Sequence, residues 1–353
     1  MTVRLSGASY EVHIGSTLIR SSGDRCRDLF GSSSCAIISD RNVARLYVPI
    51  VHQSLRVADL DPTLLTIDAG EQSKSLQCVE NACDRLVAAG LDRNSFILAL
   101  GGGVVGDLAG FVAAIFMRGI PYVQIPTTLV AQVDSSVGGK TGVNAAAGKN
   151  LIGAFHQPRL VLADVDTLRT LPEREFNSGM AEVIKHGIIR DRAMLESLKN
   201  FDREDLAPLV TRNVEIKAAI VSRDERETSG ERALLNFGHT LGHAIENAAG
   251  YGHYLHGEAI SLGIIAACRL SMRKAGFSQS DFDLVLERLG QFKLPTHLPK
   301  EVSTASIMTA LSTDKKFQDG NIRYVLAREI GDAFLADDVT PAEIGQAVEE
   351  LRL

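Results

Sequence analysis

The chain has 353 residues, of which 45% are hydrophobic and 23% charged, a composition typical of a soluble globular enzyme with room for two domains. The net charge of −6 argues against a nucleic-acid-binding surface, and no apolar run approaches the roughly 18 residues that span a membrane. Five cysteines without motif spacing, and an N-terminus without a long apolar core, predict reduced thiols in a cytoplasmic protein.

The first half of the chain alternates short apolar strands with helical segments. Predicted strands cover residues 8–14, 35–40, 64–67, 96–100, 122–125 and 160–163, and a helix covers 76–89. Buried strands separated by helices are typical of a parallel sheet. We therefore predict an α/β domain with a parallel sheet over residues 1–166.

Helical patterns dominate from about residue 166 onward. Predicted helices cover residues 178–189, 206–222, 233–248, 258–275, 281–289 and 341–351. The second domain, residues 167–353, is therefore expected to be mainly α-helical. Ligands usually bind where two such domains meet.

A glycine-rich segment follows the strand at 96–100. Gly101–Gly106 fits the pattern GxGxxG and opens an apolar helix over residues 107–117, the setting in which this motif binds a dinucleotide pyrophosphate. No acid ends a strand about 20 residues downstream, so the upstream Asp40 and Glu71 are candidates for the ribose hydroxyls. The alternative is a tight structural turn.

A second glycine-rich segment, residues 134–150, contains Lys140 and Lys149. Its centre, Gly138–Gly142, looks like the end of a P-loop, but Ser135 stands where that motif requires glycine, which argues against an ATPase. Glycines and lysines together suit phosphate contacts. A flexible, solvated loop is the alternative interpretation.

The densest cluster of functional residue types is histidine. His239 and His243 are four residues apart and share one face of a predicted helix, with His253 and His256 nearby. Paired imidazoles at this spacing suit zinc. Thr240 replaces the glutamate that zinc proteases place after the first histidine, so peptide hydrolysis is disfavoured. Alternatively, the histidines cap the helix or fill a polar seam.

A helix further upstream carries Glu182, Lys185 and His186 on adjacent positions of one face. Glu182 is a candidate third metal ligand, in a His, His, Glu site with an open position for substrate. The alternative is a surface Glu–Lys pair.

Polar residues also precede the histidines. Arg232 and Asn236 lie seven and three residues before His239, and we expect them to continue its helical stripe into a polar cleft. Asp314–Lys316 is a charged loop and on its own suggests no more than solvation.

Taken together, several long segments resemble the 3-dehydroquinate synthase family of the shikimate pathway, within the sugar-phosphate cyclase superfamily. They cover residues 70–316 in the family's order. The segments are GEQSKS from Gly70, GGGVVGDLAGFVAA from Gly101, RGIPYVQIPTTLVAQVDSSVGGKTGVN from Arg118, GKNLIGAFHQP from Gly148, AEVIKHG from Ala181, LNFGHTLGHAIE from Leu235, HGEA from His256 and DKK from Asp314.

The resemblance implies a Rossmann-like NAD-binding domain followed by a helical domain that holds Zn²⁺, with Co²⁺ as a substitute. It assigns the metal to Glu182, His239 and His256 and moves His243 to the substrate side. NAD contacts map to Asp40, Glu71, Lys74, Gly103, Val104, Val105, Gly106, Asp107, Thr127, Thr128, Lys140, Lys149, Thr167, Leu168, Arg169 and Thr170.

The resemblance also implies a substrate site completed by a homodimer. Substrate contacts map to Asp134, Lys140, Asn150, Lys185, Lys217, Arg232, Asn236, His243 and Lys316, and Arg118 is the arginine that reaches across to the partner. Against the family spacing, the loop from Asp224 to Arg232 is one residue longer, which leaves two alternatives: the family's active-site glutamate is Glu227, or the loop is built differently in this chain.

The implied reaction is a lyase step in chorismate and aromatic amino acid biosynthesis. It converts 3-deoxy-D-arabino-heptulosonate 7-phosphate to 3-dehydroquinate and phosphate through NAD-mediated oxidation, phosphate elimination, reduction, ring opening and an intramolecular aldol. The alternatives are a related cyclase of secondary metabolism, a metal-dependent polyol dehydrogenase and a noncatalytic dinucleotide sensor.

Overall fold

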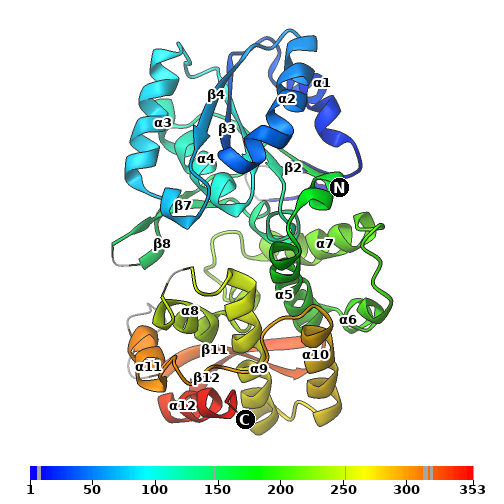
Figure 1. The fold of residues 1–353 in the computed structure, drawn as a ribbon, viewed down its shortest axis with the longest axis vertical. Helices are drawn as coiled ribbons and strands as arrows, with labels where there is room; N and C mark the ends of the chain where they lie inside the picture. The colour runs from blue at the N-terminus through cyan, green and yellow to red at the C-terminus, as the bar shows by residue number, and fades with distance from the viewer. Residues whose placement is uncertain (6–8, 147, 251, 313–316, 319–320, 353) are drawn as a thin grey trace. The chain divides into compact units, whose positions relative to one another are not determined.

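The computed structural model describes residues 1–5, 9–146, 148–250, 252–312, 317–318 and 321–352 (Figure 1). Asp314–Lys316, and with it the predicted substrate contact Lys316, lies outside these ranges. The chain forms two compact units. The first contains Met1–Leu171 and Asp205–Ala218, and the second contains Pro172–Glu204 and Ala219–Leu353.

The first unit is built on a seven-stranded sheet with the order β1-β2-β9-β6-β5-β3-β4. Its strands are β1 (Thr2–Val3), β2 (Tyr10–Gly15), β3 (Cys35–Asp40), β4 (Pro62–Ile67), β5 (Phe96–Gly101), β6 (Tyr122–Pro126) and β9 (Leu160–Asp164). β1 pairs antiparallel with β2, and the other neighbours pair in parallel. Each of the six predicted strands overlaps one of these, and the predicted parallel α/β domain is confirmed.

Helices cover both faces of this sheet (Figure 1). Alternate residues of β3 point to opposite faces of the sheet, and both sets are apolar and need cover. Ala36 and Ile38 pack with α3 and α4, whereas Cys35 and Ile37 pack with α1 and α2. A strand buried on both faces reads as a continuous apolar run. The helical segments of the first unit are η1 (Leu18–Ser21), α1 (Ser22–Phe30), α2 (Arg41–Val57), η2 (Glu71–Ser73), α3 (Leu76–Ala88), α4 (Gly103–Ile115), η3 (Phe116–Arg118), η4 (Ala131–Ser135) and η5 (Val165–Thr170).

The glycine-rich segment after η4 is a β-hairpin, so the interpretation as a flexible loop is wrong. Strands β7 (Lys140–Ala145) and β8 (Gly148–Phe155) pair antiparallel, with Gly142 opposite Gly153. A β-carbon on Gly153 would lie 2.1 Å from the carbonyl oxygen of Thr141. These glycines therefore permit close contact between two strands.

The second unit is mainly helical, as predicted, and also contains a sheet that the sequence analysis did not foresee. Its antiparallel order is β10-β11-β12. The elements are α5 (Glu173–Arg190), α6 (Arg192–Ser197), η6 (Leu198–Asn200), η7 (Arg232–Asn236), α8 (His239–Ala248), α9 (His256–Ala275), α10 (Gln279–Gln291), α11 (Thr304–Ser312), β10 (Phe317–Gln318), β11 (Asn321–Glu329), β12 (Asp332–Val339) and α12 (Pro341–Glu350). Helix α7 (Ala207–Arg223) divides between the units at Ala218.

The predicted helix over residues 233–248 is wrong at its start. η7 is a 3₁₀ segment, and Gly238, which follows it, has a left-handed φ of 76°. An α-helix cannot continue through that conformation. Arg232 and Asn236 therefore do not lie on the helical stripe of His239.

The lengths and polarities of the helices show whether any of them could cross a membrane. Within the described ranges, no helix combines the length and apolar character that crossing a bilayer requires.

Candidate active site

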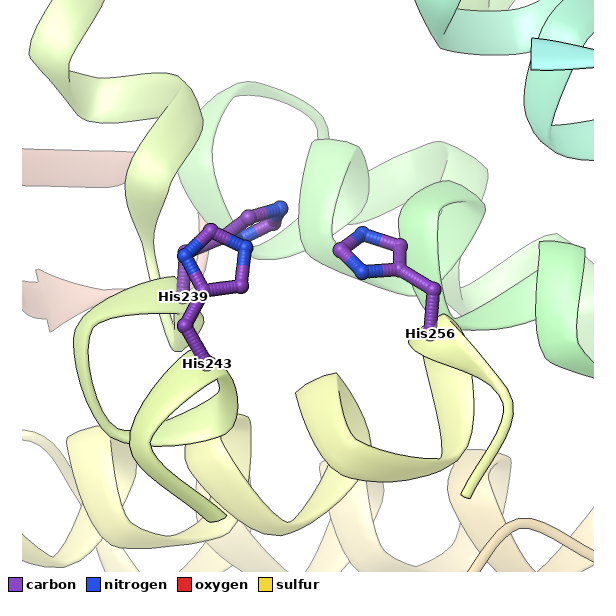
Figure 2. Close-up of side chains that lie close together, drawn as sticks. All are labelled: His239, His243 and His256. Carbon is purple, nitrogen blue, oxygen red and sulfur yellow. The ribbon is translucent and has the colours of Figure 1, made fainter. Parts of the chain in front are cut away.

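Three imidazoles gather at the N-terminal ends of α8 and α9. His239 and His243 lie one turn apart on α8, as their spacing predicts, and His256 is the first residue of α9. Figure 2 shows the ring of His256 facing the other two. Ring centroids are 5.3 Å apart for His239 and His243, 5.4 Å for His239 and His256, and 5.7 Å for His243 and His256. One nitrogen from each ring lies within 4.8 Å of the others.

Glycines bring the two histidine-bearing helices into contact. A β-carbon on Gly263 of α9 would lie 2.0 Å from the carbonyl oxygen of Gly238, and one on Gly238 would lie 2.8 Å from the backbone nitrogen of Ile264. No side chain fits at that distance. The backbone approach therefore places the start of α8, with His239 and His243, beside α9.

A carboxylate from α5 joins the histidine cluster. Glu182 is completely buried, and its Oε1 lies 3.3 Å from Nε2 of His239 and 3.3 Å from Nε2 of His256. Its other oxygen accepts from the ammonium group of Lys185, which is also buried. The alternative of a surface Glu–Lys pair is therefore wrong. Among the residues that the structure describes, Oε1 accepts no hydrogen bond.

The electrostatic surroundings favour the cation-binding forms of Glu182 and His239, whereas in the absence of a metal they favour a protonated His256, which must lose its proton to bind one. Burial by itself raises the pKa of the Glu182 carboxyl, but Lys185 and the two imidazoles outweigh it and hold that pKa well below its usual range. Burial lowers the pKa of His239. Burial also opposes protonation of His256, but the carboxylates of Glu182 and Glu246 raise its pKa to about 9. An anionic oxygen and imidazole nitrogens are the ligands that zinc prefers.

Glu246 is a site residue that the sequence analysis missed. It is buried on α8, and its Oε2 lies 3.9 Å from Nδ1 of His256, the nitrogen that faces away from Glu182. A carboxylate behind a metal-binding imidazole typically fixes its tautomer and orientation. The available signal was its position, three residues after His243 on the same predicted helix.

Asp224 is a second missed residue, and it organises the loop that leads to Arg232. The buried carboxylate accepts from four backbone N–H groups, those of Thr228 at 2.7 Å, Ser229 at 3.2 Å, Gly230 at 3.1 Å and Arg232 at 3.1 Å. Burial by itself raises the pKa of Asp224, but these amides outweigh it and hold the pKa well below its usual range. The loop is therefore a closed turn around one anion.

Glu227, the expected position of the family's active-site glutamate, lies inside that turn. Glu227 adopts a left-handed φ of 58°, and its Oε1 accepts from Nδ2 of Asn236 at 3.4 Å. The side chain of Arg232 is buried, and its guanidinium donates to the backbone carbonyl of Glu225. Three of the residues named from the sequence, Glu227, Arg232 and Asn236, thus belong to one connected structure.

In the first unit, the order of the sheet indicates where a ligand binds. From β3 the chain proceeds to β4 on one side and then to β5 on the other, so the strand order reverses between β3 and β5. Open α/β sheets bind ligands beyond the carboxyl ends of the strands at such a reversal. Asp40 ends β3 and caps α2, while Gly101 ends β5 and leads into α4 at Gly103.

Lys74 links several of the predicted NAD contacts. Its ammonium nitrogen lies 2.7 Å from Oδ2 of Asp107 and donates to the side-chain carbonyl of Asn150, and it is 3.9 Å from Glu71. Burial raises the pKa of Asp107, an effect that Lys74 only partly offsets. Asn144, a residue missed from the sequence, donates to Glu71 at 2.9 Å and completes the cluster.

Two predicted substrate contacts also meet in this unit. Nζ of Lys217 lies 2.8 Å from Oδ1 of Asp134, and Lys217 is buried. Lys140 is exposed at the start of β7, and Arg118 is exposed at the end of η3 with a left-handed φ of 67°. The remaining residues assigned to NAD also belong to this unit: Val104, Val105 and Gly106 in α4, Thr127 and Thr128 after β6, Lys149 in β8, and Thr167, Leu168, Arg169 and Thr170 in η5.

Comparison with known proteins shows the family. Residues 64–178 match the family described as 3-dehydroquinate synthase N-terminal, and residues 179–317 match 3-dehydroquinate synthase C-terminal. The 3-dehydroquinate synthase of Pelobacter propionicus is 48% identical over 344 residues, which cover 96% of this chain and 95% of that protein.

Two solved structures share the fold over nearly the whole chain. A 2-deoxy-scyllo-inosose synthase complexed with carbaglucose-6-phosphate, NAD⁺ and Co²⁺ has a TM-score of 0.90 at 27% identity, covering 99% of both chains. ValA, the 2-epi-5-epi-valiolone synthase of Streptomyces hygroscopicus with NAD⁺ and Zn²⁺ bound, has a TM-score of 0.89 at 30% identity, covering 99% of this chain and 98% of that one. Both are less similar in sequence than the Pelobacter synthase. The chain belongs to the 3-dehydroquinate synthase family and is an enzyme of that activity, a carbon–oxygen lyase of the shikimate pathway.

Proposed function

We propose that the enzyme works with bound NAD and a zinc ion, and that Glu182, His239 and His256 hold the zinc. The observation that carries this proposal is the buried Oε1 of Glu182, which accepts no hydrogen bond within the described residues and lies 3.3 Å from Nε2 of both imidazoles. A buried anionic oxygen without a donor is costly unless a cation satisfies it. Three ligands of this kind leave a position open for substrate.

A competing ligand set consists of His239, His243 and His256, whose nitrogens are also close enough to share an ion. We favour Glu182 over His243 because Glu182 is completely buried, whereas His243 is exposed. A buried carboxylate oxygen gains more from a bound cation than an exposed imidazole, which water already solvates. His243 then belongs with the residues that contact the substrate.

The cofactors that we propose match those named for two relatives. The 2-deoxy-scyllo-inosose synthase structure holds NAD⁺ and Co²⁺, and the valiolone synthase structure holds NAD⁺ and Zn²⁺. When bound, zinc would supply Lewis acidity toward a substrate hydroxyl, and NAD would accept and return a hydride. Co²⁺ has similar ligand preferences and is expected to replace zinc.

We propose that NAD binds at the carboxyl ends of β3 and β5. The N-terminus of α4, with Gly102 and Gly103, offers backbone N–H groups to the pyrophosphate. Lys74 holds Asp107 on that helix by the 2.7 Å ion pair. Tyr47 fixes η5 by donating to the carbonyl of Thr167 at 3.1 Å. Together these contacts hold the residues assigned to NAD in fixed positions.

The substrate carries a carboxylate and a phosphate, so its site needs several cations. We propose that buried Lys185, Lys217 and Arg232, exposed Lys140, and Lys316 provide them, with Asp134, Asn150, Asn236 and His243 contacting its hydroxyls. Lys217 and Arg232 are already held by Asp134 and by the loop around Asp224. Their positions are therefore set before the substrate arrives, which lowers the cost of ordering them on binding.

We also propose a homodimer in which Arg118 reaches the partner's site. Arg118 is exposed, and apolar Ile115 and Met117 beside it are 45% and 44% exposed. Exposed apolar residues around an exposed arginine are typical of a surface that meets another protein.

The experiment is to incubate the purified enzyme with 3-deoxy-D-arabino-heptulosonate 7-phosphate and NAD at a concentration below that of the substrate. We expect orthophosphate in excess of the NAD supplied, loss of the activity after chelation, and recovery with Zn²⁺ or Co²⁺. Accumulation of NADH in proportion to product would indicate a dehydrogenase instead. Full activity of the metal-free enzyme would contradict the proposed zinc.

A further inference from the structure

We propose that Arg174 is a positioning residue for the metal site: its ion pair with Glu258 fixes the first turn of α9, and with it His256, against helix α5, which carries Glu182. The inference rests on the proposed metal site and concerns two residues that belong to neither ligand set. Arg174 lies in the first turn of α5, and Glu258 lies in the first turn of α9.

The contact between the two side chains is bidentate. Nε of Arg174 donates to Oε1 of Glu258 at 2.7 Å, and Nη2 donates to Oε2 at 2.8 Å. Nη2 also donates to the backbone carbonyl of His253 at 3.3 Å, and Oε2 of Glu258 accepts from the backbone N–H of Leu255 at 2.8 Å. One arginine thus holds the chain on both sides of His256.

A second contact, one turn further along α5, brings the backbone of α9 against that helix. The N–H of Gly257 donates to Oγ of Ser178 at 3.0 Å. A β-carbon on Gly257 would lie only 1.8 Å from the carbonyl oxygen of Ser178. The residue that follows His256 is therefore packed directly against α5.

The Arg174–Glu258 pair, the Ser178–Gly257 contact and the approach of Glu182 to His256 together fix how α9 is aligned along α5. Arg174, Ser178 and Glu182 are spaced four apart, so they lie along one face of α5. In the same order they meet Glu258, Gly257 and His256, ending with the 3.3 Å approach of Glu182 to the imidazole. A shift of α9 along or around this face would change the distance between the two proposed ligands.

The surroundings of Arg174 indicate a role in alignment more than in folding. Its side chain is 60% exposed, on the wall of a surface pocket that Glu173, Asn177 and Lys293 also line. The side chain of Glu258 is only 13% exposed, but it also accepts from the N–H of Leu255, so loss of the solvated guanidinium should cost little overall stability. A planar bidentate contact still restricts the relative orientation of the groups that it joins.

The chain offers a matched control on the same turn of α5. Lys293 pairs with Glu173 at 2.7 Å across the same pocket, and within the described residues this pair makes no hydrogen bond or ion pair with the first turn of α9. The experiment compares Arg174→Gln, Arg174→Lys and Lys293→Gln with the wild-type enzyme. For each, Zn²⁺ affinity is measured by competition with a chromophoric chelator, the visible spectrum of the Co²⁺ form is recorded, and thermal unfolding of the metal-free protein is followed.

We expect Arg174→Gln to weaken zinc binding by roughly 10- to 100-fold, the range for residues that orient metal ligands, and to change the Co²⁺ spectrum. Arg174→Lys keeps the positive charge but cannot make the planar bidentate contact with Glu258. The zinc affinity of this variant should therefore lie between those of the wild type and Arg174→Gln. Lys293→Gln should match the wild type. All four metal-free proteins should unfold at closely similar temperatures.

Wild-type zinc affinity and an unchanged Co²⁺ spectrum in Arg174→Gln would overturn the inference. So would a metal-free Arg174→Gln protein that unfolds well below Lys293→Gln, because the pair would then serve folding. A wild-type enzyme that binds no stoichiometric zinc would instead refute the proposed metal site and remove the basis of the inference.

Discussion

Nζ of Lys217 lies 2.8 Å from Oδ1 of Asp134 and also donates to the backbone carbonyl of the same residue. The two come from distant parts of the sequence, and Lys217 is buried. A cation in this position is already partnered by Asp134. In the substrate site that we propose, the substrate anion would share Lys217 with Asp134, so the pair would couple recognition of that anion to recognition of a nearby hydroxyl.

Replacing Lys217 by methionine should raise the KM for the heptulosonate phosphate by roughly 10- to 150-fold, since a hydrogen bond to a charged group contributes about 1.5–3 kcal/mol. Methionine keeps most of the apolar stem, so the effect reports the lost ammonium group. Steady-state phosphate release measures it, with the exposed Lys199→Met as the control. An unchanged KM would remove Lys217 from the substrate site.

The two possible ligand sets differ in their response to substitution of His243. We expect His239→Ala to lose zinc and turnover while still binding NAD, and His243→Ala to keep zinc while losing activity. Metal analysis of the purified variants distinguishes the two ligand sets. Binding of the reduced cofactor, followed by the fluorescence of NADH, shows whether the NAD site is intact. Loss of zinc from both variants would favour the three histidines over the set with Glu182. Full metal occupancy in His239→Ala would contradict both sets.

The Asp224 loop predicts a dependence of stability on pH. A carboxyl whose pKa is lowered in the folded state stabilises the protein above its unfolded pKa of about 3.9, and this contribution is lost as the pH falls through the folded-state pKa. Asp224→Asn can no longer satisfy all four amides and should lower the free energy of unfolding by roughly 1–3 kcal/mol at pH 7. Denaturant unfolding at several pH values should show the difference shrinking in acid. A constant difference down to pH 3 would argue against an ionised Asp224.

Arg118 predicts complementation between two inactive variants. If Arg118 of one subunit serves the partner's site, then a heterodimer of Arg118→Ala and Lys140→Ala has one intact site and one doubly altered site. An equal mixture after subunit exchange should recover about a quarter of the wild-type activity, because half of the dimers are mixed and each has one working site. Activity that stays at the level of the separate variants would place Arg118 in its own subunit's site or outside any site.

Much of the fold follows from local patterns. The strand at residues 96–100 was predictable because a strand buried on both faces is apolar at every position, and β5 is buried throughout. The pairing of His239 and His243 followed from helical spacing. The break at Gly238 did not, since glycine within a helical pattern is ambiguous, and its left-handed φ depends on the contact with α9.

The missed parts depend on contacts distant in sequence. The glycines of β7 and β8 suggested a loop because the contact that requires glycine, the approach of Gly153 to Thr141, is made with the opposite strand. Glu246 and Asp224 are ordinary acids until the chain buries them beside His256 and four backbone amides. Burial likewise distinguishes the pair of Glu182 and Lys185 from a surface salt bridge, and spacing on one helix contains no information about burial.

Residues 205–218 belong to the first unit although they follow more than thirty residues of the second, so the chain passes between the units at 171, 204 and 218. No single cut yields one fragment that contains the whole first unit and nothing else. A fragment that ended at Leu171 would contain Asp134 without Lys217. Engineers who wish to exchange one half of this enzyme for that of a relative should therefore transplant the returning segment as well.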